Sequence, residues 1–149
     1  AEETAPLLKK AAEDMRKAGL CFSPEGNSPA SARLFEALGT GCVPIVVSHR
    51  HRISFDLPFP SLVDYDAIAI FSEPFRDIAK KVGGGMAALS ATLENLLHDQ
   101  LTQRMRHDGF KAFKKYFSYM NNPEGVVRGL LMEAWVLLMR HNIVSDIYI

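Results

Sequence analysis

Three side chains near residue 30 have the types and the spacing needed to hold a phosphorylated ligand. Ser31, Arg33 and Glu36 follow a loop rich in glycine, serine and proline. Backbone N–H groups at a helix N-terminus, together with the helix dipole, attract anions. An arginine there can donate two hydrogen bonds to a diphosphate, and a carboxylate one turn later can accept hydrogen bonds from ribose hydroxyls. The pattern therefore indicates one half of a nucleotide-binding site.

Helices and short apolar strands alternate before residue 72 and would position these side chains. Ser28 suits a helix N-cap and Pro29 the first helical position, so the sequence predicts a helix over about 29–38. We expect a further amphipathic helix over 5–18, and strands over 20–23, 43–47 and 67–71.

Helical periodicity dominates the remainder of the chain. We expect a short helix near 75–81, a long leucine and phenylalanine pattern from Met86 to Met120, and a last helix opened by Asn122-Pro123-Glu124. The leucine and phenylalanine stripes are expected to be core, and Trp135 is expected to pack between domains.

This order of elements predicts an α/β fold with a Rossmann-like parallel sheet of about three or more strands and a helical C-terminal tail. The 149 residues correspond to a single domain, with a leading helix (1–19), an α/β core (20–82) and the tail (83–149). Because doubly wound domains usually have more strands, we expect one half of a larger fold.

The amino-acid composition limits the kinds of molecule that this chain is expected to bind. Seventeen Lys and Arg balance seventeen Asp and Glu, so no global field favours nucleic acid. Apolar runs are too short to span a membrane, no signal peptide is visible, and we expect no membrane contact within this segment. Cys21 and Cys42 head adjacent expected strands and are either bridged or free, and a free buried Cys42 is the favoured interpretation.

Four blocks of sequence resemble the exostosin-like glycosyltransferases. They are Cys21-Phe22-Ser23-Pro24-x-Gly26, Ser31-x-Arg33-Leu34-x-Glu36-Ala37, Gly41-Cys42-Val43-Pro44-Ile45-Val46-x-Ser48 and Leu57-Pro58-Phe59. Two positions depart from the family pattern. Ser23 stands where a second cysteine is common, which puts a local disulfide in doubt, and Ser48-His49 replaces a Ser-Asp pair.

The resemblance implies the C-terminal, donor-binding half of a GT-B fold. It implies inverting transfer from a nucleotide sugar, most often a UDP sugar, to a glycan or glycoprotein acceptor held by a missing N-terminal domain. Arg33 would contact the diphosphate and Glu36 the ribose, and Gly26, Ser28 and Ser31 would shape or line the phosphate loop. The family's usual setting is the Golgi lumen, within a type II membrane protein.

No catalytic residue is assigned, because Asp56, Asp64 and Asp66 qualify as a base by type alone and the acceptor-side base usually belongs to the other domain. The GT-B resemblance also implies that no metal cofactor is needed. The alternative function is a catalytically inactive nucleotide-binding or protein-interaction module.

Three simpler interpretations stay open. Arg33 and Glu36 have the spacing of a surface ion pair. The basic loop 49–52 either contacts donor or acceptor or is solvated. The cations between Arg104 and Lys115 form a solvated helix face or grip an acidic polysaccharide or phospholipid.

Overall fold

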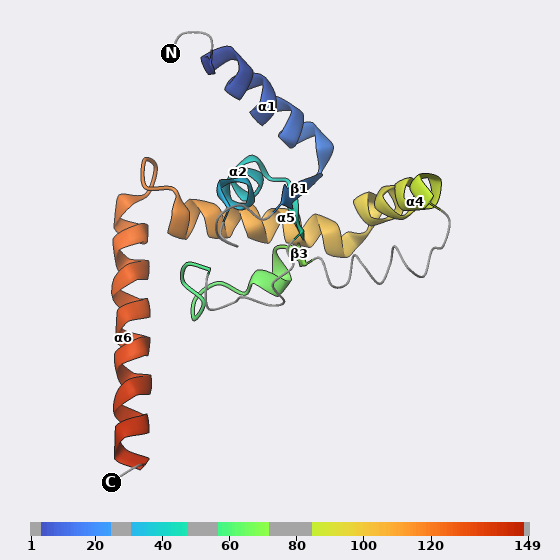
Figure 1. Cartoon of the computed structure of the whole chain (residues 1–149). Helices are drawn as coiled ribbons and strands as arrows, with labels where there is room; N and C mark the ends of the chain where they lie inside the picture. The colour runs from blue at the N-terminus through green and yellow to red at the C-terminus, as the bar shows by residue number, and fades with distance from the viewer. Residues whose placement is uncertain (1–3, 25–30, 48–56, 72–84, 148–149) are drawn as a thin grey trace.

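The computed structural model describes residues 4–24, 31–47, 57–71 and 85–147, which form a three-stranded parallel sheet with helices packed against it (Figure 1). The strands are β1 (Leu20–Pro24), β2 (Val43–Val47) and β3 (Ile70–Phe71), in the order β1-β2-β3. The helices are α1 (Thr4–Ala18), α2 (Ala32–Thr40), the 3₁₀ turn η2 (Tyr65–Ala67), α4 (Gly85–His98), α5 (Gln100–Ala112), the π-helical turn η3 (Phe113–Phe117) and α6 (Pro123–Ile147). The predicted α/β class with a parallel sheet is confirmed.

The sheet is built from short strands with β2 in the centre. Cα pairs join Leu20 to Val43 and Ile45 to Ile70, so both neighbours run parallel to β2. The strand predicted over 67–71 is shorter than expected, because the Asp64 carboxylate accepts a hydrogen bond from the Asp66 N–H and starts η2 instead. Side chains that cap a turn compete in this way with strand pairing.

Helix α2 begins later than the predicted range of 29–38. Its N-cap is Ser31, whose backbone is extended (φ −71°, ψ 150°), and the first helical residue is Ala32. The helix ends at Thr40, because Gly41 adopts a left-handed conformation (φ 75°). The Gly41 N–H then donates to the carbonyl of Leu38 at 3.2 Å, and the Cys42 N–H donates to the carbonyl of Ala37 at 2.9 Å. The predicted start at residue 29 was therefore too early, and Ser28 and Pro29, the predicted cap and first helical position, lie outside the described residues.

The helical pattern predicted from Met86 to Met120 is divided into α4, α5 and η3. Asp99 caps α5 by accepting a hydrogen bond from the Leu101 N–H at 3.1 Å, which separates α4 from α5. The helix predicted near 75–81 lies outside the described residues. Helix α6 begins at Pro123, which confirms the start predicted at 122–124.

One core joins the sheet to α2, α5 and η3. Helices α2 and α5 pack against each other and against β2. The apolar core residues are Leu34, Leu38, Val46, Leu57, Phe59, Val63, Tyr65, Ile68 and Ala69. Phe117 continues this core, with ring centroids 5.1 Å from Phe35 and 5.6 Å from Phe59. These aromatic contacts fix the C-terminal helices against the α/β part of the chain.

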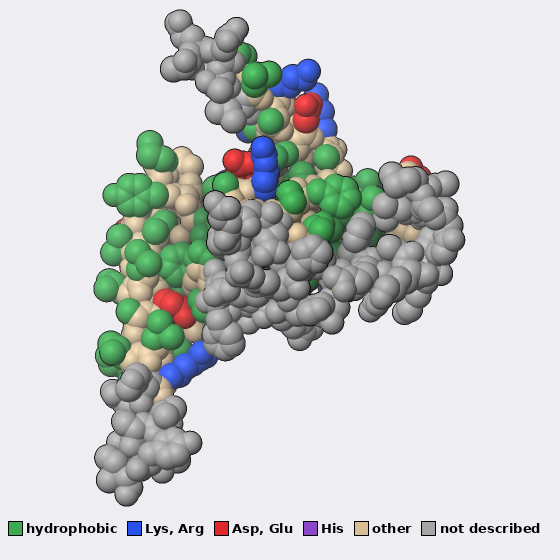
Figure 2. All heavy atoms as spheres, viewed as in Figure 1, with side chains coloured by type: hydrophobic (Ala, Val, Ile, Leu, Met, Phe, Trp, Pro, Cys, Tyr) green, Lys and Arg blue, Asp and Glu red, His purple; other side chains and the backbone are tan. Residues whose placement is uncertain are grey.

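Helix α6 projects from this body with apolar side chains around it (Figures 1 and 2). The exposed residues are Val127, Leu130, Leu131, Met132, Trp135, Leu137, Leu138 and Met139, with between 45% and 67% of each accessible. The expectation that this leucine stripe forms core is therefore wrong for the chain by itself. None of the described helices has both the length and the apolar content that a membrane span needs.

A buried carboxylate attaches α6 to the segment before η2. Glu133 is 9% exposed, and its two oxygens accept hydrogen bonds from the Ser61 hydroxyl at 2.8 Å and the Ser61 N–H at 3.1 Å. Tyr65 donates a hydrogen bond to the carbonyl of Pro58 in the same segment, and burial raises the pKa of its phenol well above the ordinary value.

Glu133→Ala is expected to lower the free energy of unfolding by about 1–3 kcal/mol, because the substitution removes two hydrogen bonds to a half-buried serine. Urea denaturation measures this change. Glu124→Ala, at an exposed position of the same helix, is the matched control and should change stability by less than about 0.5 kcal/mol. Additive effects of Ser61→Ala and Glu133→Ala would show that the two residues do not stabilise the fold together.

Candidate nucleotide-binding site

The carboxyl end of β1 and the start of α2 are joined by two serine hydroxyls. Ser23, which is 2% exposed, lies 3.1 Å from Ser31 between their Oγ atoms. Although Ser31 is the N-cap of α2, its hydroxyl accepts no hydrogen bond from the backbone of the helix. The hydroxyl contacts Ser23 instead. This contact puts the α2 N-terminus at the edge where parallel α/β sheets bind ligands.

Arg33 and Glu36 form an ion pair on the exposed side of α2. The Arg33 Nη1 donates to the Glu36 Oε2 at 2.8 Å, and the two side chains are 53% and 47% exposed. The predicted surface pair is therefore present. Such exposed pairs contribute between zero and about 1 kcal/mol to the free energy of unfolding, so the fold depends little on either side chain.

The ion pair borders an open cavity of about 590 Å³ that runs along α2. Apart from the pair, its lining is mostly apolar and comes from α1, α2 and η3: Ala11, Ala12, Met15, Ala32, Phe35, Gly39, Thr40 and Phe113. Gly39 permits the close approach of Phe113, because a Cβ at Gly39 would lie 2.9 Å from that ring. The cavity offers apolar surface beside one cation and one anion.

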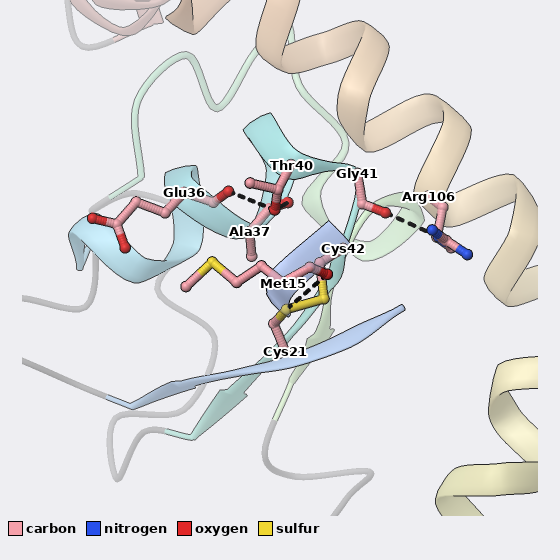
Figure 3. The surroundings of a disulfide bond; sticks show 8 residues. All are labelled: Met15, Cys21, Glu36, Ala37, Thr40, Gly41, Cys42 and Arg106. Carbon is pink, nitrogen blue, oxygen red and sulfur yellow. Dashed lines mark hydrogen bonds between the residues drawn. A yellow bond between two sulfur atoms is a disulfide. The ribbon is translucent and has the colours of Figure 1, made fainter. Parts of the chain in front are cut away.

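A disulfide bond lies beneath the C-terminal half of α2 (Figure 3). Cys21 of β1 and Cys42, which precedes β2, are bonded and pack against Ala37 and Met15. The favoured interpretation of Cys42 as a free buried residue is wrong. Both cysteines head adjacent parallel strands, and their Cα atoms are 5.9 Å apart, within the range that a disulfide bridges.

The C-terminal end of α2 is also held by side chains. Arg106 of α5 donates from Nε to the carbonyl of Gly41 at 2.9 Å, and Thr40 donates to the carbonyls of Glu36 and Ala37, each at 2.9 Å (Figure 3). The helix that carries the candidate side chains is thus fixed at one end by the disulfide and Arg106, and at the other by the serine contact.

The structure describes only some of the other residues that were predicted to belong to the site. Gly26 and Ser28 lie outside the described residues, as do the basic loop 49–52 and Asp56. Asp64 and Asp66, which qualified as a base by type alone, belong to a turn, because the Asp64 carboxylate caps η2 by accepting a hydrogen bond from the Asp66 N–H. The Ser61–Glu133 contact could not be predicted from the sequence, because 72 positions separate the two residues and no periodic pattern links them.

Comparison with known proteins agrees with this architecture. A parallel α/β sheet with helices against it is consistent with part of a Rossmann-like GT-B glycosyltransferase. The exostosin GT47 domain family matches residues 2–80, and the chain belongs to this family. The resemblance inferred from the four sequence blocks is confirmed.

Several plant proteins are similar to this chain. A probable arabinosyltransferase of Arabidopsis thaliana, ARAD1, is 30% identical over 85% of this chain and 25% of its own length. A probable glucuronosyltransferase of Oryza sativa, GUT1, is 37% identical over 40% of the chain and 13% of its own length. A probable β-1,4-xylosyltransferase of Arabidopsis thaliana, IRX10, is 36% identical over the same share. The chain thus spans a quarter or less of these relatives, and no solved structure was found to match it.

Proposed function

We propose that this chain is the donor-binding part of a glycosyltransferase that transfers a sugar from a UDP sugar to a glycan acceptor with inversion. Family membership supports the reaction class, and the names of the relatives support a pentose or a hexose-derived sugar. The observation that carries the proposal is the position of Arg33 and Glu36, which lie together in the first turns of α2 beside an open cavity.

Binding would exchange one partner of Arg33 for another. In the structure its guanidinium is paired with Glu36 at 2.8 Å, and the diphosphate of the donor would replace that carboxylate. Backbone N–H groups at the start of α2 would add hydrogen bonds to the same diphosphate. Glu36, released from Arg33, would accept hydrogen bonds from the ribose, while Gly26, Ser28 and Ser31 would form the phosphate loop.

The proposed reaction is a direct displacement. An acceptor hydroxyl oxygen bonds to the anomeric carbon, the bond from that carbon to the phosphate oxygen breaks, and the hydroxyl proton passes to a base. Arg33 and the helix N-terminus would stabilise the negative charge on the departing diphosphate, with no metal needed. The base and the acceptor pocket would belong to a domain outside these residues.

The disulfide supports a location for this chemistry. Disulfides persist in oxidising compartments, so Cys21 and Cys42 fit a domain that folds in the secretory pathway. We propose the Golgi lumen, as part of a type II membrane protein.

Thermal-shift measurements with UDP, GDP, ADP and their sugars test this function. We expect UDP to raise the melting temperature at millimolar concentration and to do so more than GDP or ADP, since ligand that binds only the folded state stabilises it. Transfer of sugar by the isolated chain should be negligible, because the proposed acceptor domain would lie outside these residues. The proposal is wrong if no nucleotide changes the melting temperature, or if the chain alone transfers sugar efficiently.

A further inference from the structure

Cationic side chains gather on the exposed side of α5 and η3. Arg104, Lys111, Lys114 and Lys115 are all exposed, and we call these four residues the cationic stripe. Steps of three or four residues place side chains on one face of a helix. Over residues 100–117 the chain carries five Arg and Lys but one carboxylate, whereas the whole chain has a formal charge of zero. The positive charge is therefore concentrated on this element.

The stripe has no carboxylate partners within the described part of the chain. The ion pairs found there are Arg33–Glu36, His107–Asp108 and Arg128–Glu124, none of which includes a residue of the stripe. The ammonium groups of Lys114 and Lys115 instead lie 4.4 Å from the ring centre of Phe110 and 4.7 Å from that of Tyr116. A cation–π contact at an exposed site is weak and leaves the charge of the ammonium group without a neutralising carboxylate.

Within the described residues, none of these four cations forms an ion pair with a carboxylate. Arg106, the fifth cation of this element, points to the Gly41 carbonyl and fixes α2. The opposite face of α5, with Thr102, Met105 and Gly109, is buried against the core. The element is thus a fixed helix with one free cationic side, unlike an amphipathic helix that inserts an apolar face into a membrane.

We propose that the cationic stripe binds a linear polysaccharide that carries carboxylate groups, such as a chain of uronic acids. Lys111 lies three and four positions before Lys114 and Lys115, a separation of roughly 5–6 Å on a helix, and Arg104 lies two turns before Lys111. The charges are therefore spread along the helix axis, as the carboxylates are spread along an extended chain of uronic acids. Phe110, partly exposed beside Lys114, adds apolar surface for a sugar ring. That this glycan is the acceptor rests on the proposed transferase function, whereas the binding itself does not.

A calorimetric binding experiment tests the proposal. It measures the affinity of the 149-residue chain for an oligogalacturonate at low and at moderate salt concentration. The stripe variant combines Arg104→Gln, Lys111→Gln and Lys114→Gln. The control variant removes the same number of charges from exposed positions of α1 through Lys9→Gln, Lys10→Gln and Lys17→Gln. We expect the stripe variant to lose about tenfold or more in affinity and the control to lose less than about twofold.

Affinity of the wild type should also fall as salt rises, since salt screens exposed charges. UDP binding should be the same in all three proteins, so a failed donor site and a failed glycan site give different results. Equal losses in the stripe and control variants would overturn the proposal, as would equal binding of a neutral xylo-oligosaccharide. Stripe-dependent binding to phosphatidylserine vesicles without binding to the oligogalacturonate would assign the surface to a membrane instead.

Discussion

Replacing Cys21 and Cys42 together with alanine is expected to lower the free energy of unfolding by about 2–4 kcal/mol. The bond closes a loop across a separation of 21 residues, and this loop contains both β1 and α2. Breaking it lets the unfolded chain gain conformational entropy. In the folded state, the sulfur atoms also fill the space between Met15 and Ala37.

Denaturation in urea, with and without a reductant, measures this effect. The reductant should destabilise the wild type by a similar amount and leave the double alanine variant unchanged. If the wild type and the double variant unfold at the same urea concentration, the disulfide does not stabilise the domain. A reductant effect on the variant would show that reduction acts elsewhere.

Arg33→Ala is expected to weaken UDP binding by about 1.5–3 kcal/mol, because it removes a charge-assisted hydrogen bond to the diphosphate. Stability should change by less than about 1 kcal/mol, since the ion pair with Glu36 is half-exposed. Arg128→Ala is the matched control, because Arg128 forms a similar exposed helical pair with Glu124 at 2.9 Å. A large loss of stability with unchanged affinity for UDP would make Arg33 a structural residue.

The local signals in the sequence were sufficient for β1 and β2 but not for the length of β3 or for every helix boundary. Val43–Val47 has a run of β-branched residues and a central position in the sheet, and it was predicted correctly. The start of α2 was not, because Ser28 and Ser31 are both acceptable caps. The contact of Ser31 with the buried Ser23, which accompanies the later start, is a tertiary interaction.

The contacts that hold the candidate site together could be predicted least. The spacing of Arg33 and Glu36 alone predicted that they share one helix face, and the ion pair between them is present. The sequence could not decide whether Cys21 and Cys42 are bonded, because the spacing of two cysteines in the chain does not give the distance between their strands. Contacts such as Arg106 with Gly41, across 65 residues, leave no periodic signal in the sequence.

Helix α6 shows a different reason for error. Its apolar residues have helical spacing, which predicts burial, yet Leu131 and Leu138 are exposed. A pattern of apolar residues indicates that a face is covered but does not say which part of a protein covers it.

The affinities of UDP and uridine for the wild type and for Arg33→Ala, measured by calorimetry, test the central claim that the start of α2 holds a diphosphate. We expect the wild type to bind UDP at least about tenfold more tightly than uridine, and Arg33→Ala to remove most of that preference, since a tenfold preference corresponds to about 1.4 kcal/mol. The same preference for UDP over uridine in both proteins would contradict the assignment of Arg33 to the diphosphate.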